Sequence, residues 1–108
     1  MSEEHKIGEK ELSEIRFIQY VSILTNAGMQ QLGKIMNPVT GKMEKSLEAA
    51  KATIELISML KQKTKGNLSA NEEQVIAGAL ANLQLNYADE VSRMEKEGPG
   101  AKREDKGK

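Results

Sequence analysis

The chain has 108 residues, which is enough for one small domain with a modest core but not for two independent domains. Basic and acidic residues number 16 each, so no net charge draws the chain to nucleic acid or an anionic membrane, and only a local patch could do so. The absence of cysteine excludes disulfides, thiolate metal sites and a thiol nucleophile. The start is polar and no apolar run is long enough to span a membrane, so we expect a cytoplasmic protein.

Residues 1–12 are polar and are predicted to be flexible, and a first helix is predicted over about 13–33. At 100° per residue, its apolar side chains fill an arc of about 200°. Only Ile23 falls among the polar residues on the opposite side. The apolar arc consists of Phe17, Ile18, Tyr20, Val21, Leu24, Ala27, Gly28, Met29 and Leu32.

The next segment, MNPVTGKMEK at residues 36–45, predicts a turn. Pro38 lacks an amide hydrogen and Gly41 permits positive φ, so a helix is unlikely to continue through it. Its Gly-Lys pair resembles the end of a phosphate-binding loop. Such a loop needs a glycine five residues earlier and a Ser or Thr after the lysine, where this chain has Met36 and Met43. The pattern therefore favours a turn over a phosphate site.

A second helix is predicted over about 46–65, with Ser46 as its N-cap. Its apolar residues form two adjacent stripes that together cover more than half of the circumference. A helix with so little polar surface must contact more than one neighbour. One stripe is Leu47, Ala50, Ile54 and Ile57, and the other is Ala49, Thr53, Leu56 and Leu60.

The KTKGNL stretch at residues 63–68 allows two interpretations. As a connector, Gly66 supplies the left-handed residue that ends the second helix, and Leu68 packs back onto its last turn. As a site, Lys63, Lys65 and Asn67 hold an anion together with free amides of the following helix. Glu72 and Glu73 at that helix start weaken the second interpretation, so we favour the connector. The candidate interaction loop is Lys63, Thr64, Lys65, Gly66 and Asn67.

A third helix is predicted over about 70–95 and begins with a capping box formed by Ser69 and Glu72. Its core stripe is narrower, about 120° wide. Residues 96–108 carry charge and no large apolar side chain, so they are predicted to form a disordered tail. The stripe comprises Ile76, Ala79, Leu80, Leu83, Tyr87, Val91 and Met94.

We predict no catalytic, cofactor or metal site. His5 is the only histidine, so one chain cannot build a histidine dyad or a two-histidine metal site. The carboxylate pairs Glu72 with Glu73 and Asp89 with Glu90 are helix neighbours that point about 100° apart, which indicates solvated charge. Among the methionines, Met29 and Met94 fall on apolar arcs, while Met36, Met43 and Met59 could lie inside or outside.

Three stretches, NPVTGK, AKATIELISMLKQKTKGNLSANEEQ and LANLQLNY, resemble a family of small, mostly bacterial helical proteins known as domain of unknown function 1844. KTKGNL is the most recognisable part. Glu55 stands where the family usually has aspartate. The family has no assigned activity, so the resemblance implies a helical fold without a reaction. A loop that recurs in a family also implies a role beyond capping for Lys63, Thr64 and Asn67.

These patterns predict an all-α fold, with one helical domain over 13–95 built from a helical hairpin and a third helix. The first two helices offer more apolar surface than the third can cover, and soluble monomers rarely expose so large a patch. We therefore expect a homo-oligomer, with a dimer favoured. Its candidate interface is Phe17, Val21, Leu24, Ile54, Leu56, Ile57 and Leu60.

The leading functional hypothesis is a non-enzymatic interaction protein that associates with itself and docks another protein through the KTKGNL end or through leftover apolar surface. The alternative is an accessory factor for RNA or ribosomes that uses the same loop and the basic residues of the tail. Nucleic-acid contact would then be weak and salt-sensitive. An enzyme ranks third, because its polar groups would have to converge across an interface that one sequence does not reveal.

Overall fold

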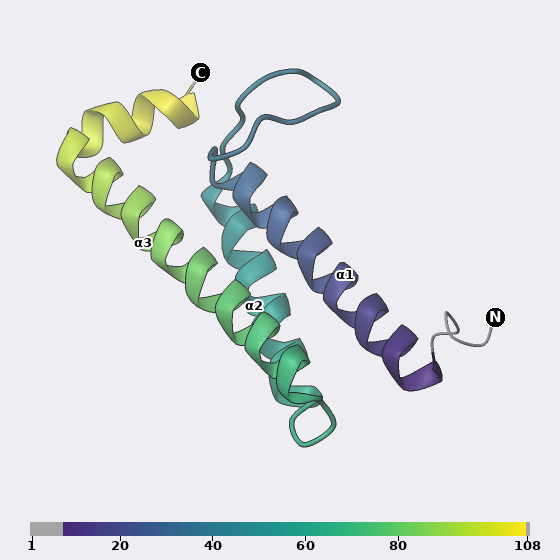
Figure 1. Ribbon diagram of the computed structural model, residues 1–108. Coiled ribbons are helices and arrows are strands. Elements are labelled where there is room, and N and C mark those ends of the chain that lie inside the picture. Colours follow the sequence, from purple (N-terminus) through teal and green to yellow (C-terminus); the bar gives the residue numbers. More distant parts are fainter. Residues whose placement is uncertain (1–7, 108) are drawn as a thin grey trace.

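The computed structural model describes the backbone of residues 8–107 and the side chains of residues 8–96. It contains three helices, α1 (Glu9–Gln31), α2 (Leu47–Lys63) and α3 (Ala70–Gly107), and all three pack against one another. Within the described residues there is no strand, only two isolated bridges in the connector between α1 and α2. Figure 1 shows α1 and α2 running in opposite directions, with α3 along their length. The predicted all-α, three-helix fold is confirmed.

Helix α1 begins four residues earlier than its pattern of apolar residues predicts. The amide of Gly8 donates a hydrogen bond to Glu11 Oε1 at 3.1 Å, and Glu9 and Glu11 place negative charge at the positive end of the helix dipole. Polar residues that looked like a flexible leader therefore cap the helix instead. Residues 1–7 of the predicted flexible segment lie outside the described residues.

The predicted caps of α2 and α3 are confirmed. Ser46 Oγ accepts a hydrogen bond from the amide of Ala49 at 3.2 Å. At the start of α3, the amide of Ser69 donates to Glu72 Oε1 at 2.8 Å, and the amide of Glu72 donates to Ser69 Oγ at 3.1 Å. Glu72 is consequently buried in its cap, so the expectation of solvated charge is wrong for this residue.

Helix α3 continues through Gly107, beyond the end predicted near residue 95. Its C-terminal part, yellow in Figure 1, turns away from the axis of the rest of the helix. Residues 96–108 were expected to be a disordered tail, whereas the backbone from 96 to 107 is helical. The residues after Gly100 include alanine, lysine, arginine and glutamate, which favour a helix, whereas Gly98, Pro99 and Gly100 disfavour one, and a proline inside a helix is a common cause of such a bend.

The core lies where the three helices meet. Gly28 of α1 allows the closest approach, because a Cβ atom there would lie 2.8 Å from Leu83 Cδ2 of α3 and 3.4 Å from Thr53 Cγ2 of α2. Beside it, Thr53 Oγ1 donates to Gln31 Oε1 at 2.6 Å and fixes α2 against α1. The buried apolar residues are Val21, Leu32, Ala50, Ile54, Ile57, Ile76 and Leu83.

This packing corrects the predicted oligomer interface. Val21 and Ile57 are fully buried within one chain, and Ile54 is 9% exposed, because α3 covers the stripe on which they lie. Phe17, Leu24 and Leu60 are partly buried and pack against the same core. Only Leu56, which is 40% exposed, offers a large free surface among the seven candidates.

Candidate functional site

The KTKGNL connector is used mainly to end α2. Gly66 has φ of +84°, as predicted for a left-handed residue. The Thr64 hydroxyl donates to the Leu60 carbonyl at 2.8 Å, and the Asn67 amide donates to the Thr64 carbonyl at 2.9 Å. Leu68 packs back against the core, as expected. The backbone and Thr64 therefore serve as a C-cap.

The connector does not gather its polar side chains into one anion site. Lys65 lines a groove between α2 and α3, whereas Lys63 does not line it. At the start of α3, the Ser69 hydroxyl donates to Glu14 Oε2 at 2.9 Å, so a carboxylate from α1 reaches the same helix end. Together with Glu72, it surrounds this end with negative charge, which disfavours an anion. Anion binding by this loop remains a prediction.

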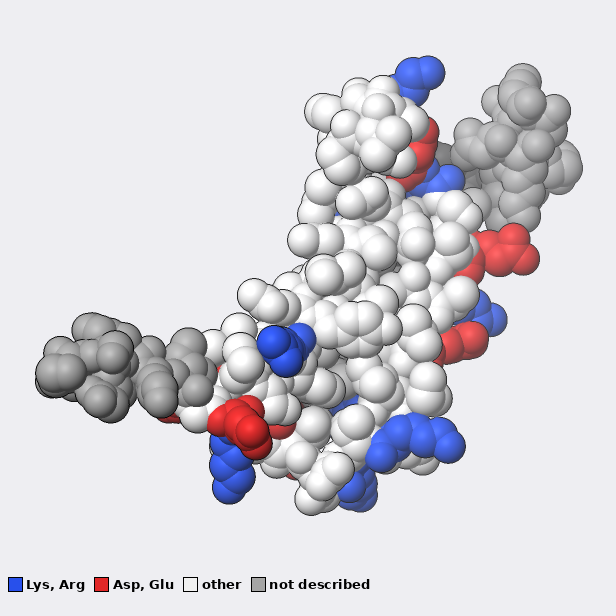
Figure 2. Space-filling view, turned by 90° about the vertical axis from the view of Figure 1, so that its right-hand side faces the viewer, with Lys and Arg blue, Asp and Glu red and all other residues white. Residues whose placement is uncertain are grey.

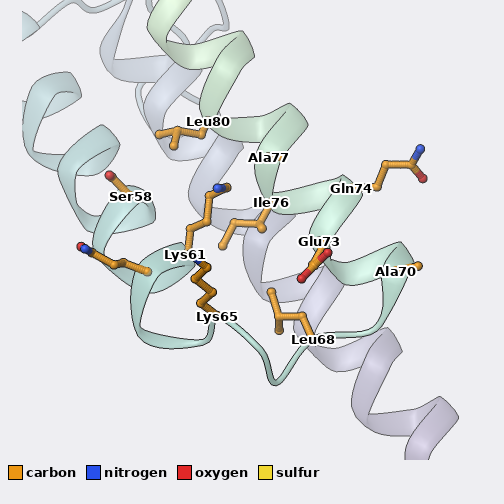
Figure 3. Close-up of a pocket in the computed structure, with 11 residues that line it drawn as sticks. Ser58, Lys61, Lys65, Leu68, Ala70, Glu73, Gln74, Ile76, Ala77 and Leu80 are labelled. Atoms are coloured by element: carbon orange, nitrogen blue, oxygen red, sulfur yellow. The ribbon is translucent and has the colours of Figure 1, made fainter.

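The groove beside the connector has a volume of about 820 Å³. Figure 3 shows Lys61 and Lys65 on the α2 side and Glu73 on the α3 side, with Leu68 and Ile76 between them. Its walls therefore carry opposite charges above an apolar floor. The arrangement suits a polypeptide segment and contains no paired nucleophile and base.

A second surface lies on the outer side of the α1 and α2 pair, and we call it the α1–α2 face. Thr53 of α2 donates a hydrogen bond to Gln31 of α1. Helical spacing places Leu56 on the same flank of α2 as Thr53. On α1, Ile23 and Ala27 lie on the side of Gln31, which accepts that bond. The exposed fractions are 50% for Tyr20, 63% for Ile23, 40% for Leu56 and 43% for Met59. The face is defined as Tyr20, Ile23 and Ala27 of α1 with Ala52, Leu56 and Met59 of α2.

The α1 half of the α1–α2 face is free of charge, whereas on α2 Glu55 and Lys63 lie four residues from Met59. Residues 17–33 contain no Asp, Glu, Lys or Arg, so most of α1 contributes only apolar and neutral polar side chains. Figure 2 looks onto the side of the molecule where α1 lies and shows mostly uncharged residues across its middle, with charged residues mainly towards its edges. Tyr20, Ile23 and Met59 were not among the interface residues predicted from the sequence. The place of Ile23 among polar residues was the available indication, because an isoleucine there has no role in the core.

The connector between α1 and α2, residues 33–45, forms an ordered loop that carries more exposed apolar side chains. The Asn37 amide donates to the Lys42 carbonyl at 2.8 Å, which confirms the predicted turn. Glu44 accepts hydrogen bonds from Asn37 Nδ2 at 3.0 Å and from Thr40 Oγ1 at 3.1 Å. The exposed apolar residues are Ile35 at 39%, Met36 at 51%, Val39 at 90% and Met43 at 58%.

Glu90 of α3 holds both ends of this loop. Its carboxylate accepts from Lys34 Nζ at 2.7 Å and from Lys45 Nζ at 2.8 Å, and its side chain is only 5% exposed. Burial by itself would raise the pKa of Glu90, but the hydrogen bonds from the two lysines outweigh it and lower the pKa. The hydrogen bonds that Lys34 donates to Glu90 and to Asp89 raise the pKa of Lys34. The expectation of solvated charge is therefore wrong for Glu90.

The described residues also lack two features that would indicate the type of site. Among the side chains that the structure describes, no three histidine or carboxylate groups come together as metal ligands would. None of the helices in the described part combines the length and the apolar character needed to cross a bilayer. Neither finding assigns a function by itself.

Comparison with protein families gives one result. The model of the family described as Domain of unknown function (DUF1844) matches residues 14–89, which include α1 from its sixth residue, all of α2 and the first half of α3. Searches of curated proteins and of solved structures found no match. Since the matched region is well over half of the chain, the protein belongs to the DUF1844 family.

Proposed function

We propose that this protein is a non-enzymatic helical interaction protein whose first partner is a second copy of itself. The α1–α2 face is the proposed contact surface. It replaces the buried residues Val21, Ile54 and Ile57 as the interface, since these are already enclosed by α3. The proposed dimer forms in the cytoplasm and uses no cofactor.

The observation that carries this proposal is the exposure of large apolar side chains beside a stretch of α1, residues 17–33, that has no charged residue. Tyr20, Ile23, Leu56 and Met59 are each at least 40% exposed, and they lie on two adjacent helices. Scattered apolar residues on a surface need no explanation, but a contiguous patch indicates an interaction site. The chain has no net charge, so two copies do not repel each other over long range.

The test places a charge on the face without disturbing the core. Ile23→Asp and Leu56→Asp are each expected to convert a dimer to a monomer in sedimentation velocity at micromolar concentration, because two copies would then bury like charges against each other. Leu85→Asp on α3 is the control, since Leu85 is 72% exposed and lies outside the face. A wild-type dimer that survives both face variants would contradict the proposed surface.

Binding to RNA is the second candidate, and the lysines at the end of α2 favour it. Lys61, Lys63 and Lys65 are exposed, and none of them forms an ion pair with another described residue. The tail residues that would assist, Lys102 and Arg103, have side chains outside the described part. The test is capture of RNA or ribosomes by the wild-type chain and by the Lys61→Glu, Lys65→Glu double variant. RNA recovered equally by both would exclude these lysines.

A further inference from the structure

The loop over residues 33–45 presents apolar side chains in a fixed shape. Inside the loop, the Val39 amide donates to Asn37 Oδ1 at 2.8 Å and the Lys42 amide donates to Thr40 Oγ1 at 3.3 Å. At its base, Glu90 binds the lysines on both ends. A surface that is ordered before binding loses less conformational entropy when it binds. The 90% exposure of Val39 is therefore not explained by a mobile turn.

The α1–α2 face alone is small for a stable dimer. Helix α2 has 17 residues, which at 1.5 Å per residue gives a length of about 25 Å. Two helices packed 8–10 Å apart present a strip about 20 Å wide, so the face covers about 500 Å². A standard interface buries about 800 Å² on each partner. A dimer that uses this face therefore needs further contact area beside it.

The loop and the face are continuous through a hollow of about 670 Å³. Its walls are Ile23, Asn26, Ala27 and Gln30 of α1, together with residues at the base of the loop. This volume is in the range of ordinary binding pockets. Ile23 belongs to the α1–α2 face, so the hollow opens beside the surface that is proposed to meet a second copy. Figure 1 shows the loop at the top of the molecule, beside the C-terminal end of α1.

We infer that the loop of each copy, led by Val39 and Met43, seats in the hollow beside α1 of the other copy. This inference rests on the proposed self-association and names the element that completes its interface. A two-fold axis makes the contact reciprocal, so that it occurs twice in one dimer. The loop and the hollow lie at the same end of α1 in each copy, so the two reciprocal contacts add apolar area at that end.

The side chains at the tip of the 33–45 loop are similar in polarity to those that line the hollow. The tip carries Val39 and Met43, and the hollow offers Ile23 and Ala27. Asn26 and Gln30 add side-chain amides that can donate to the carbonyl oxygens of Pro38 and Val39. Within the described chain those two oxygens accept no hydrogen bond. Glu44 and Lys45 at the rim are already paired with Thr40 and Glu90, so they add no unpaired charge.

The first test measures the dimer dissociation constant of the full chain. The Val39→Ser, Met43→Ser double variant is expected to raise it at least about tenfold, because two apolar contacts are lost on each copy. Leu85→Ser removes an exposed apolar side chain from α3 and is expected to change it less than about twofold. Circular dichroism checks that the helices of both variants are intact. An unchanged constant in the loop variant would overturn the loop contact while leaving self-association in place.

A second test uses the absence of cysteine from the chain. Separate Val39→Cys and Asn26→Cys variants are mixed and oxidised, and the disulfide joining the two different chains is identified by mass spectrometry. Seating of the loop predicts this mixed product in excess over the product of Val39→Cys with Leu85→Cys. Equal yields would contradict the placement. A wild-type chain that is monomeric throughout would instead overturn the proposed function on which the loop contact depends.

Discussion

The two flanks of α2 have similar amino acids but very different surroundings. On the inner flank, Ala50 and Ile57 are fully buried and Ile54 is 9% exposed. On the outer flank, Leu56 and Met59 are 40% and 43% exposed. The difference arises because α3 packs along one side of the α1 and α2 pair and leaves the other side open. Apolar content alone therefore does not indicate an interface, and the position of the covering helix decides which residues stay available.

The largest difference in stability between the two flanks is expected from substitutions at the neighbouring residues Ile57 and Leu56. Ile57→Ala is expected to lower the free energy of unfolding by about 2–5 kcal/mol, because it leaves a cavity in the core. Leu56→Ala should cost less than about 1 kcal/mol in the monomer, since its side chain is already half in water. Urea unfolding at one protein concentration measures both. Equal losses would mean that α3 does not distinguish the flanks.

The next largest effect concerns the loop base. Glu90→Gln removes the charge that binds Lys34 and Lys45, and hydrogen bonds to charged groups contribute about 1.5–3 kcal/mol each when they are well formed. Because both lysines reach solvent, we expect a total loss of about 2 kcal/mol. Asp89→Asn is the matched control, and its exposed ion pair with Lys34 should cost at most about 1 kcal/mol. Thermal unfolding of the two variants tests whether Glu90→Gln loses more stability than Asp89→Asn.

Substitutions at two glycines, one at a packed position and one at an open position, should change the stability by smaller amounts. Gly78→Ala on α3 should stabilise the chain by about 0.5–1 kcal/mol, because a Cβ there meets nothing within 4 Å and alanine favours a helix. Gly28→Ala should instead destabilise it by about 1 kcal/mol, since the new Cβ meets Leu83 at 2.8 Å. Chemical denaturation measures both. A stabilising Gly28→Ala would show that the helices are not in close contact at that point.

Lowering the pH should produce the smallest change in stability, and this change should depend on Glu90. The pKa of Glu90 is lowered below its ordinary value of 4.5, so its contribution to stability is present above that pH and is lost as the pH falls through the folded-state pKa. Unfolding measured from pH 6 down to about pH 3 should show a loss of stability in wild type that is reduced in Glu90→Gln. Identical pH profiles would mean that Glu90 is not held by the two lysines.

Much of the fold follows from local sequence. Ser46, Ser69, Glu72 and Gly66 adopt the capping roles that their positions predict, because each depends only on neighbours three or four residues away. The earlier start of α1 was missed because a polar stretch can be flexible or can cap a helix. The extent of α3 was missed because Gly98, Pro99 and Gly100 predict an end to the helix, whereas its backbone continues past them.

The site was harder to predict because it depends on residues far apart in the chain. Glu90 meets Lys45 across 45 positions, and no local pattern distinguishes it from Asp89, which remains exposed. Similarly, a helical wheel shows that Ile54 and Leu56 are both apolar but not which of them α3 covers. Ile23 could have been found, because its place on a polar side leaves it no role in the core.

Sedimentation equilibrium of the unmodified chain at several micromolar concentrations tests the central claim most directly. If the open side of the α1 and α2 pair is an interface between two copies, the fitted mass will approach twice the 11.9 kDa of one chain as concentration rises. A mass that stays at 11.9 kDa over the whole range would mean that a single copy tolerates its exposed apolar side in water, and self-association would be contradicted.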